Sequence, residues 1–324
     1  MSKAIRVHAY GGPDVLAYED VTVTAPGPGE VQIRQTAIGL NFIDVYHRTG
    51  LYPMPLPFTP GQEAAGVVTA VGDGVTSLKV GDRVAYGAGP IGAYAEVRNA
   101  PANRLLKLPD SISDETGAAM MLKGLTVSYL LRHTYKVKPG DTILFHAAAG
   151  GVGLIACQWA KHLGATVIGT VGSPEKAELA RAHGCDHVID YTKEDVAKRV
   201  REITDGKGVP VAYDSVGKAT VQASLDSLRP RGLFVSFGNA SGPVTGFDFS
   251  ELAKRGSLYA TRPSLGAYAS TDEELADLSN ALLEVVSSGK VRIDINQRYN
   301  LADVAQAHRD LESRKTTGQT ILIP

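Results

Sequence analysis

The spacing of apolar and polar positions changes along the chain. From residue 4 to residue 100, short apolar runs that suit strands alternate with turns such as Gly11-Gly12-Pro13-Asp14. The expected elements of this part include strands over residues 31–38, 64–71 and 83–86 and a short helix over residues 42–48. Short strands separated by turns predict a compact, β-rich domain.

From Ser113 onward the apolar period becomes helical, and strands then alternate with helices. A helix is expected over residues 113–131. It is followed by strands over 142–145, 166–171, 187–189, 211–213, 233–237 and 258–261, and by helices over 151–163, 174–183, 193–203, 219–228 and 249–254. This alternation predicts an α/β fold with a doubly wound parallel sheet, whose last strand lies at the edge.

The C-terminal part departs from this alternation. Helices over 273–287 and 302–313 and strands over 291–299 and 320–323 are expected there. We expect this part to return to the first domain and complete it. Residues 1–122 and 266–324 would then form one domain and residues 123–265 the other, with a cleft between them.

A glycine-rich turn, Ala148-Ala149-Gly150-Gly151-Val152-Gly153, stands between a predicted strand and a predicted helix. It is an A-x-G-x-x-G variant of the dinucleotide fingerprint, in the strand–turn–helix context that this fingerprint requires. Small residues let the backbone approach a pyrophosphate, and N–H groups at a helix N-terminus bind its oxygens. We therefore predict dinucleotide binding; the alternative is an ordinary tight turn.

The end of the next strand distinguishes two classes of dinucleotide. Enzymes that use the non-phosphorylated cofactor usually place an acidic residue there, which binds the ribose 2′-hydroxyl. Here Gly172 and Ser173 follow the strand, and Lys176 supplies positive charge, while Glu175 is expected to point away along its helix. The pattern favours NADPH; the alternative is that Lys176 is a solvated helix lysine.

Composition and charge narrow the classes of function. Hydrophobic residues make up 44% and charged residues 21% of the 324 positions, as in a globular protein. The net charge of −1 offers no basic excess, so nucleic acid is not expected as a partner. Cys157 and Cys185 suit a reducing compartment, and no apolar run of 18 residues could span a membrane. We expect a cytoplasmic protein.

Several motifs taken together resemble a known family. They are Gly39-Leu40-Asn41-Phe42-Ile43-Asp44, Pro60-Gly61-Gln62-Glu63-Ala64-Ala65-Gly66-Val67-Val68, Val80-Gly81-Asp82-Arg83-Val84, His146-Ala147-Ala148-Ala149-Gly150-Gly151-Val152-Gly153 and Ala305-Gln306-Ala307-His308. Over essentially its whole length the sequence resembles the zinc-independent quinone oxidoreductases of the medium-chain dehydrogenase/reductase superfamily. The resemblance implies a GroES-like catalytic domain, a Rossmann domain and reduction of quinones with NADPH.

Two positions separate the chain from the zinc-dependent alcohol dehydrogenases of this superfamily. Those enzymes carry a zinc-binding cysteine at the position of Asn41 and a zinc-binding histidine at the position of Gln62. Amide side chains are poor zinc ligands, and the four-cysteine lobe for structural zinc is missing. No metal is therefore expected, and the substrates should already be electrophilic, as quinones and conjugated carbonyl compounds are.

The resemblance also implies which residues bind the cofactor. Gly151 and Val152 would meet the pyrophosphate, and Lys176, Tyr191 and Arg314 would surround the 2′-phosphate, next to Gly172 and Ser173. The nicotinamide half would be lined by Asn41, Phe42, Ile43, Asp44, Val45, Tyr129, Val216, Phe237, Gly238, Asn239, Ala240, Pro263, Ser264 and Leu265.

The candidate catalytic residues are Asn41, Tyr46 and Tyr52. In the related enoyl-thioester reductases, the tyrosine of a Gly-x-Tyr-Pro stretch donates a proton or hydrogen bond to the substrate, and Gly50-Leu51-Tyr52-Pro53 matches that stretch. An enoyl or alkenal reductase is therefore the first alternative function. A non-catalytic nucleotide-binding structural protein, like the lens crystallins of this family, is the second. A homodimer joined at the edge strand is also expected, because an exposed edge needs a cover.

Overall fold

The computed structural model describes residues 2–324, and the chain forms two compact units. Unit 1 contains the residues up to Leu125, Ala269–Leu283 and Ile293–Pro324, and unit 2 contains Thr126–Tyr268 and Glu284–Arg292. The predicted domain division, 1–122 with 266–324 against 123–265, stays a prediction. In the part of the chain that the structure describes, no helix has the length and apolar character that crossing a membrane requires.

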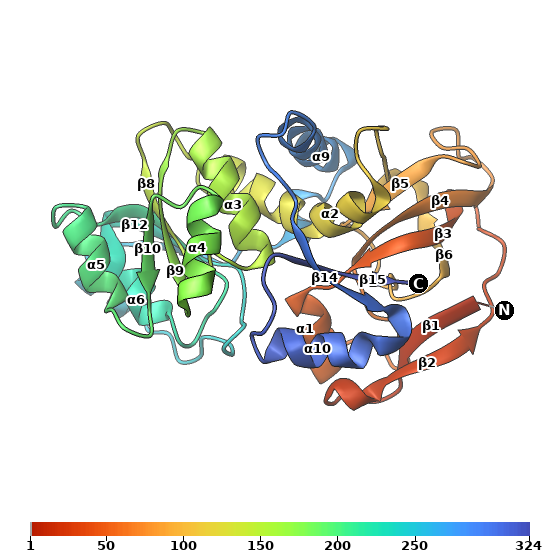
Figure 1. The fold of residues 1–324 in the computed structure, drawn as a ribbon, viewed down its shortest axis with the longest axis horizontal. Coiled ribbons are helices and arrows are strands. Elements are labelled where there is room, and N and C mark those ends of the chain that lie inside the picture. The colour runs from red at the N-terminus through yellow and green to blue at the C-terminus, as the bar shows by residue number, and fades with distance from the viewer. Residues whose placement is uncertain (1) are drawn as a thin grey trace. The chain divides into compact units, whose positions relative to one another are not determined.

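Unit 1 is built on a seven-stranded sheet that joins strands from distant parts of the chain. Its strands are β3 (Glu30–Gly39), β4 (Glu63–Val71), β5 (Arg83–Tyr86), β6 (Val97–Pro101), β7 (Leu106–Lys107), β14 (Ile295–Asn300) and β15 (Gln319–Ile323). They lie in the order β14-β15-β3-β4-β5-β7, and β6 also pairs with β3. Figure 1 shows the blue β15 beside the orange-red β3, where Ile321 pairs with Gly39 in antiparallel register.

Unit 1 also contains two α-helices and a separate antiparallel pair of strands. They are α1 (Phe42–Thr49), α10 (Val304–Glu312), β1 (Ser2–Val7) and β2 (Leu16–Val21). Two further helices, α2 (Asp114–Tyr129) and α9 (Asp272–Ser287), begin in unit 1 and end in unit 2. Val31 and Ile33 of β3 alternate with polar residues and reach the core. Gln35 follows at the next inward position, and its amide donates to Ala93 O at 2.8 Å.

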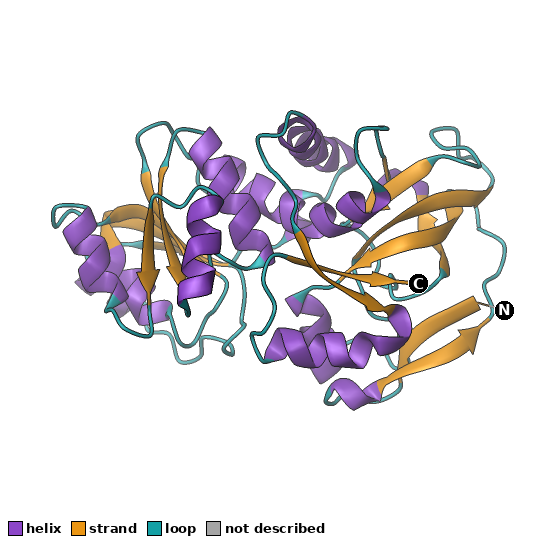
Figure 2. Cartoon of the chain, in the orientation of Figure 1, coloured by secondary structure: helices purple, strands orange, loops and turns teal. Residues whose placement is uncertain are grey.

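Unit 2 is a six-stranded parallel sheet with the order β10-β9-β8-β11-β12-β13. Its elements are β8 (Thr142–Phe145), α3 (Gly151–His162), β9 (Thr166–Val171), α4 (Pro174–Ala182), β10 (His187–Asp190), α5 (Val196–Ile203), β11 (Val209–Asp214), α6 (Val221–Ser227), β12 (Leu228–Ser236), α7 (Ser250–Lys254), β13 (Tyr259–Thr261) and α8 (Leu265–Tyr268). Right-handed crossovers put helices on both faces of such a sheet, as Figure 2 shows. The predicted α/β class, the parallel sheet and the edge position of its last strand are confirmed.

The three predicted element starts that differ most from the structure do so for local reasons. Helix α5 begins at Val196, not at residue 193, because the Asp195 carboxylate caps it and accepts from the Lys198 N–H at 2.9 Å. Strand β12 begins at Leu228, not at residue 233, because Leu228 already pairs with Val209 ahead of a register shift. Strand β14 begins at Ile295, not at residue 291, since the N–H of residue 291 closes the end of α9 instead of joining a strand.

Candidate active site

The turn between β3 and α1 places Asn41 at the N-cap of α1. Its backbone N–H donates to Asp44 Oδ2 at 2.8 Å, the contact that closes a capping box. Its side-chain Nδ2 donates to Glu63 Oε1, also at 2.8 Å. Two buried carboxylates therefore hold Asn41, one at its backbone and one at its side chain.

Glu63 begins β4 and is fully buried, with three donors around its carboxylate. Besides Asn41, Lys123 Nζ donates to Oε1 at 2.6 Å and the Leu122 N–H donates to Oε2 at 2.7 Å. The Lys123 ammonium balances the Glu63 charge inside the unit. Gly39 leaves the necessary space, because a Cβ there would lie 2.2 Å from Glu63 Oε1.

Asn41 and Gln62 stand where the zinc-dependent enzymes carry metal ligands. The Asn41 Nδ2 is committed to Glu63, and neither amide is a good zinc ligand. Among residues 2–324, no three histidine, cysteine, aspartate or glutamate side chains are grouped so that they could hold a metal ion. These residues do not fit a catalytic zinc.

The two candidate catalytic tyrosines form a packed pair at the end of α1. The rings of Tyr46 and Tyr52 meet edge to face with centroids 5.2 Å apart, and the Tyr52 N–H donates to Tyr46 O at 3.1 Å. Gly50, with a φ of +79°, lets the chain turn back after the helix. Tyr10 holds the loop that follows α1. Its hydroxyl donates to Met54 O at 2.6 Å and accepts from Met54 N at 2.7 Å.

A chain of buried polar side chains leads away from Asp44, and sequence reasoning did not find it. The Tyr94 hydroxyl lies 2.8 Å from Asp44 Oδ2 and 3.1 Å from His308 Nε2, and His308 Nδ1 lies 3.0 Å from Arg48 Nη1. Burial raises the pKa of Asp44 to about 7. Burial, with Arg48 beside it, lowers the pKa of His308 to about 3. The sequence signal that could have pointed here is His308 at the end of the Ala305-Gln306-Ala307-His308 motif.

In unit 2, the glycine-rich turn connects β8 to α3. At Gly153 a Cβ would lie 2.4 Å from the Ala147 carbonyl oxygen, so a larger residue does not fit. Gly150 stands at the N-cap and brings no side chain to the amides at the helix start. The small residues therefore leave the backbone at the start of α3 open to close approach, as a pyrophosphate site requires.

The predicted 2′-phosphate residues of unit 2 meet at the carboxyl end of β9. A Cβ at Gly172 would lie 2.3 Å from the Tyr191 hydroxyl oxygen, and Ser173 Oγ accepts from the Lys176 N–H at 3.3 Å. The expectation that Glu175 points away is wrong. The Ser173 hydroxyl donates to the Glu175 carboxylate, and this hydrogen bond lowers the pKa of Glu175. A bound phosphate would compete with Glu175 for Ser173.

The loop after β11 is organised by Asp214, which is fully buried. Asp214 Oδ1 accepts from the N–H groups of Val216 and Gly217 at 2.8 and 2.9 Å and from the Thr220 hydroxyl at 2.8 Å. Its Oδ2 accepts from the Ser224 hydroxyl at 2.7 Å. This carboxylate therefore fixes the backbone at Val216, a predicted neighbour of the nicotinamide.

The loops after β12 and β13 lie beside that one. The Ala240 N–H donates to Ser215 O at 3.2 Å, and a Cβ at Gly238 would lie 2.3 Å from the same oxygen. Arg262 donates to Gly238 O at 3.0 Å, and so holds the start of residues 263–265 at this edge of the sheet. The structure thus brings together Val216, residues 237–240 and residues 263–265, all predicted to line the nicotinamide.

Five predicted cofactor residues lie in other places. Phe42, Ile43 and Val45 occupy the first turns of α1. Tyr129, at the end of α2, stacks on Tyr268 with centroids 4.7 Å apart, and burial raises the pKa of its hydroxyl. Arg314 follows α10 in unit 1, with a φ of +61°. Their contacts with the cofactor stay predictions.

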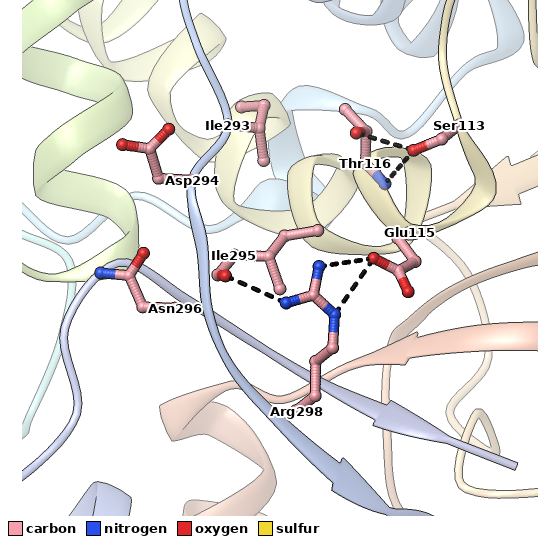
Figure 3. Close-up of a pocket in the computed structure, with 8 residues that line it drawn as sticks. All are labelled: Ser113, Glu115, Thr116, Ile293, Asp294, Ile295, Asn296 and Arg298. Atoms are coloured by element: carbon pink, nitrogen blue, oxygen red, sulfur yellow. Dashed lines mark hydrogen bonds and ion pairs between the residues drawn. The ribbon is translucent and has the colours of Figure 1, made fainter.

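A cavity of about 460 Å³ in unit 1 contains none of the predicted site residues. Figure 3 shows the side chains that line it, with Arg298 donating to Glu115 at 2.7 Å and Ser113 bonded to Thr116 at 2.9 Å. The Arg298–Glu115 ion pair is exposed to solvent, and the two charges neutralise each other. This cavity is separate from the candidate site.

Comparison with known proteins identifies the family. The alcohol dehydrogenase GroES-like domain family matches residues 27–110, and the zinc-binding dehydrogenase family matches residues 151–281. A quinone oxidoreductase of Pseudomonas aeruginosa is 59% identical, and the match covers 100% of both chains. The chain belongs to the quinone oxidoreductase family of the medium-chain dehydrogenases/reductases.

Two further members show the range of this quinone oxidoreductase family. The Escherichia coli quinone oxidoreductase complexed with NADPH matches with a TM-score of 0.98 and 53% identity, over 99% of this chain and 100% of that one. A 2-haloacrylate reductase of Burkholderia is 49% identical over 100% of this chain and 99% of its own length. Quinone and conjugated-alkene reductases therefore both occur among the full-length relatives.

Proposed function

We propose that this protein reduces quinones with NADPH and that the reaction needs no metal ion. The observation that carries this proposal is the full-length, 59% identity to a quinone oxidoreductase. Bound NADPH supplies a hydride, which is two electrons and one proton, and a second proton completes the hydroquinone. The protein is an oxidoreductase, so the non-catalytic alternative is set aside.

The residues of unit 2 fit NADPH. Gly151 and Val152 are proposed to meet the pyrophosphate at the start of α3, where the positive end of the helix favours an anion. The Tyr191 phenol lies beside Gly172, and the Ser173 hydroxyl caps α4; we propose that the Lys176 side chain joins them to bind the 2′-phosphate. We also propose Arg314 as a phosphate ligand, as the family resemblance implies.

The residues of unit 1 are proposed to receive the acceptor. Asn41 is buried and held by two carboxylates, so its amide has one orientation that needs no further ordering when a ligand binds. Tyr46 and Tyr52 pack against one another and are proposed to hydrogen-bond the acceptor oxygen that gains electron density.

Steady-state oxidation of NADPH by the purified protein tests the proposal. The rate is measured with para-benzoquinone, with an enone, with a 2-haloacrylate and with no acceptor. We expect the quinone to give the highest kcat/KM. A protein that oxidises NADPH with none of these acceptors is not a reductase of this kind.

The second candidate function is reduction of a conjugated alkene. The full-length identity of 49% to a 2-haloacrylate reductase favours it, and Tyr52 stands in the Gly-x-Tyr-Pro stretch. A kcat/KM for the enone or haloacrylate above that for the quinone would establish this function instead. Tyr52→Phe would then lower the alkene rate more than the quinone rate, because only the alkene needs a proton on carbon.

We further propose a homodimer joined at β13. This strand lies at the sheet edge, and Tyr259 on it is 61% exposed. An edge strand offers unpaired N–H and C=O groups to a second copy around a two-fold axis. Light scattering at micromolar concentration measures the mass, and a monomer would contradict the dimer. If the Tyr259→Pro variant remains a dimer, the interface lies on another surface, because proline removes a backbone N–H donor from β13.

A further inference from the structure

A buried path of hydrogen bonds joins the start of α1 to α10 in unit 1, and the proposed function does not use it. The path runs from Asp44 through Tyr94 and His308 to Arg48, and Arg48 pairs with Glu312 at the surface. The side chains of Asp44, Tyr94 and His308 have no exposed surface.

The chemistry of the donors sets the direction of every hydrogen bond in this path. A guanidinium can only donate, so Arg48 Nη1 donates to His308 Nδ1 at 3.0 Å. His308 is neutral because its pKa lies at about 3, so its proton sits on Nε2, which donates to the Tyr94 oxygen at 3.1 Å. The Tyr94 hydroxyl therefore has its proton free to donate to Asp44 Oδ2 at 2.8 Å.

Every hydrogen bond in the path is thus donated in the direction of Asp44. Asp44 in turn holds Asn41 of the candidate site. The same Oδ2 accepts the backbone N–H of Asn41 at 2.8 Å. The other carboxylate oxygen, Oδ1, is buried and has no hydrogen-bond partner in the described structure. Asp44 is therefore held through Oδ2 only. We call the hydrogen bonds from Tyr94 and from the Asn41 N–H to this oxygen the Asp44 clamp, and the position of Asp44 in it depends on the Tyr94 hydroxyl.

Packing fixes Tyr94 in this position. Its ring lies against Gly61, where φ is +92° and a Cβ would lie 2.4 Å from Tyr94 Cδ1. Its N–H donates to Pro60 O at 2.9 Å, and its ring meets the His308 ring edge to face at 5.9 Å. The glycine of the Pro60-Gly61-Gln62-Glu63 motif therefore makes room for Tyr94.

We propose that Tyr94 and His308 are positioning residues for catalysis: they hold the Asp44 carboxylate against Asn41 and so set the orientation of Asn41 at the reacting centre. The proposal rests on the proposed quinone reduction. It assigns no proton transfer to the path, because Arg48 at its outer end does not give up a proton.

The clamp makes catalysis sensitive to pH. The groups that act on the Asp44 carboxyl are Tyr94, Glu63 on β4, Lys123 on α2 and the backbone N–H of Asn41 at the N-cap of α1. Burial and Glu63 raise the pKa of Asp44 to about 7, whereas Tyr94, Asn41 and Lys123 oppose this rise. Below about pH 7 the carboxyl takes up a proton and becomes a weaker acceptor for Asn41, so kcat should fall on the acid side.

The pH profile of kcat tests the proposal, with Tyr94→Phe as the main variant. Phenylalanine keeps the ring and removes the donor to Asp44. We expect the acid limb of the profile to move up by about one pH unit, so that kcat falls roughly fivefold at about pH 7 and roughly tenfold well below it, while KM for NADPH changes little. His308→Leu should act in the same direction. His308→Gln should restore most of the activity, because an amide again supplies one acceptor and one donor.

His183→Gln is the matched control. His183 is also buried and also accepts from an arginine, Arg292 Nη2 at 3.2 Å, but it lies in unit 2. Its profile should match that of the original protein. An acid limb that stays in place in Tyr94→Phe, with activity lost equally at every pH, would overturn the proposal and leave Tyr94 a packing residue.

A second readout does not depend on activity. Carbon NMR of the labelled aspartate carboxyls follows the Asp44 titration directly, with Asp44→Asn to assign the signal. We expect a higher pKa in Tyr94→Phe than in the original protein, and an unchanged pKa would refute the clamp. If the original protein fails to reduce quinones, the proposed function fails, whereas the titration still decides whether Tyr94 holds Asp44.

Discussion

Two fully buried aspartates, one in each unit, are partnered in opposite ways. Asp214 in unit 2 accepts four hydrogen bonds, two from backbone N–H groups and two from hydroxyls, and both of its oxygens are used. Asp44 in unit 1 accepts two, both on Oδ2, and its Oδ1 has no partner in the described structure. The same side chain is thus saturated in one unit and half satisfied in the other.

The difference indicates what each carboxylate does. A buried carboxylate whose four hydrogen bonds use both oxygens can hold a loop in one conformation. Asp44 has only two donors to offset its burial, and burial raises its pKa to about 7. Asp214 therefore serves as a fixed support for the Val216 loop, while Asp44 responds to pH within the ordinary range.

The largest loss of stability is expected from Asp214→Asn. An amide oxygen in place of Oδ1 can keep its three donors, but the NH2 group in place of Oδ2 faces the Ser224 hydroxyl, so one buried donor loses its acceptor. We expect a loss of roughly 1–3 kcal/mol in the free energy of unfolding, measured with urea. The exposed Asp226, which pairs with Arg255, supplies the control Asp226→Asn, with at most about 1 kcal/mol. Equal losses in the two variants would contradict the supporting role of Asp214.

The effect of Asp44→Asn on stability should differ in kind, because it should change with pH. The pKa of Asp44 is about 7 in the folded protein against 3.8 for the ordinary value, so its contribution to stability is full below about pH 4 and is lost as the pH rises to 7. Asparagine does not titrate. The free energy of unfolding of the variant, minus that of the original protein, should therefore rise by about 1.4 kcal/mol per pH unit in this range. Urea unfolding at about pH 5 and about pH 8 measures it, and a constant difference would show that Asp44 does not titrate there.

The contrast between these residues also shows what sequence reasoning could reach. Strands β8 and β9 have the predicted bounds because buried parallel strands are apolar runs that end at turns. The capping contact between Asn41 and Asp44 is local in sequence and lies within the reach of such reasoning. The contacts of Tyr94 with Asp44 and with His308 join three distant segments, and a single tyrosine or histidine carries no periodic signal. The orientation of Glu175 was missed for another reason, because it depends on the competition for the Ser173 hydroxyl.

Lys176→Ala tests whether the half-buried Lys176 contributes to cofactor binding. The buried carboxylates, in contrast, are expected to contribute to protein stability. A phosphate bonded by Lys176 gains roughly 1.5–3 kcal/mol, so the variant should bind NADPH about 10–100-fold more weakly. NADH lacks the 2′-phosphate, and its affinity should stay nearly unchanged. Fluorescence titration with both cofactors measures this, with Lys198→Ala on α5 as an exposed-lysine control. Equal weakening of both cofactors would show that Lys176 does not bind the phosphate.

The smallest effect, none within error, is expected from removing metal ions. The carboxylate of Glu63 has its counter-charge within unit 1, since Lys123 donates to it at 2.6 Å, and Asn41 occupies the same oxygen from the other side. Zinc would have to displace both donors and then find two further ligands, where Asn41 and Gln62 offer amides. We therefore expect dialysis against a chelator to leave kcat unchanged, while a zinc-dependent alcohol dehydrogenase treated in parallel loses its activity. Stoichiometric zinc by elemental analysis, with activity lost on its removal and regained on its return, would mean that Glu63 and Lys123 separate to admit a cation. The buried charges of unit 1 would then be a metal site, and Asp44 would titrate beside it.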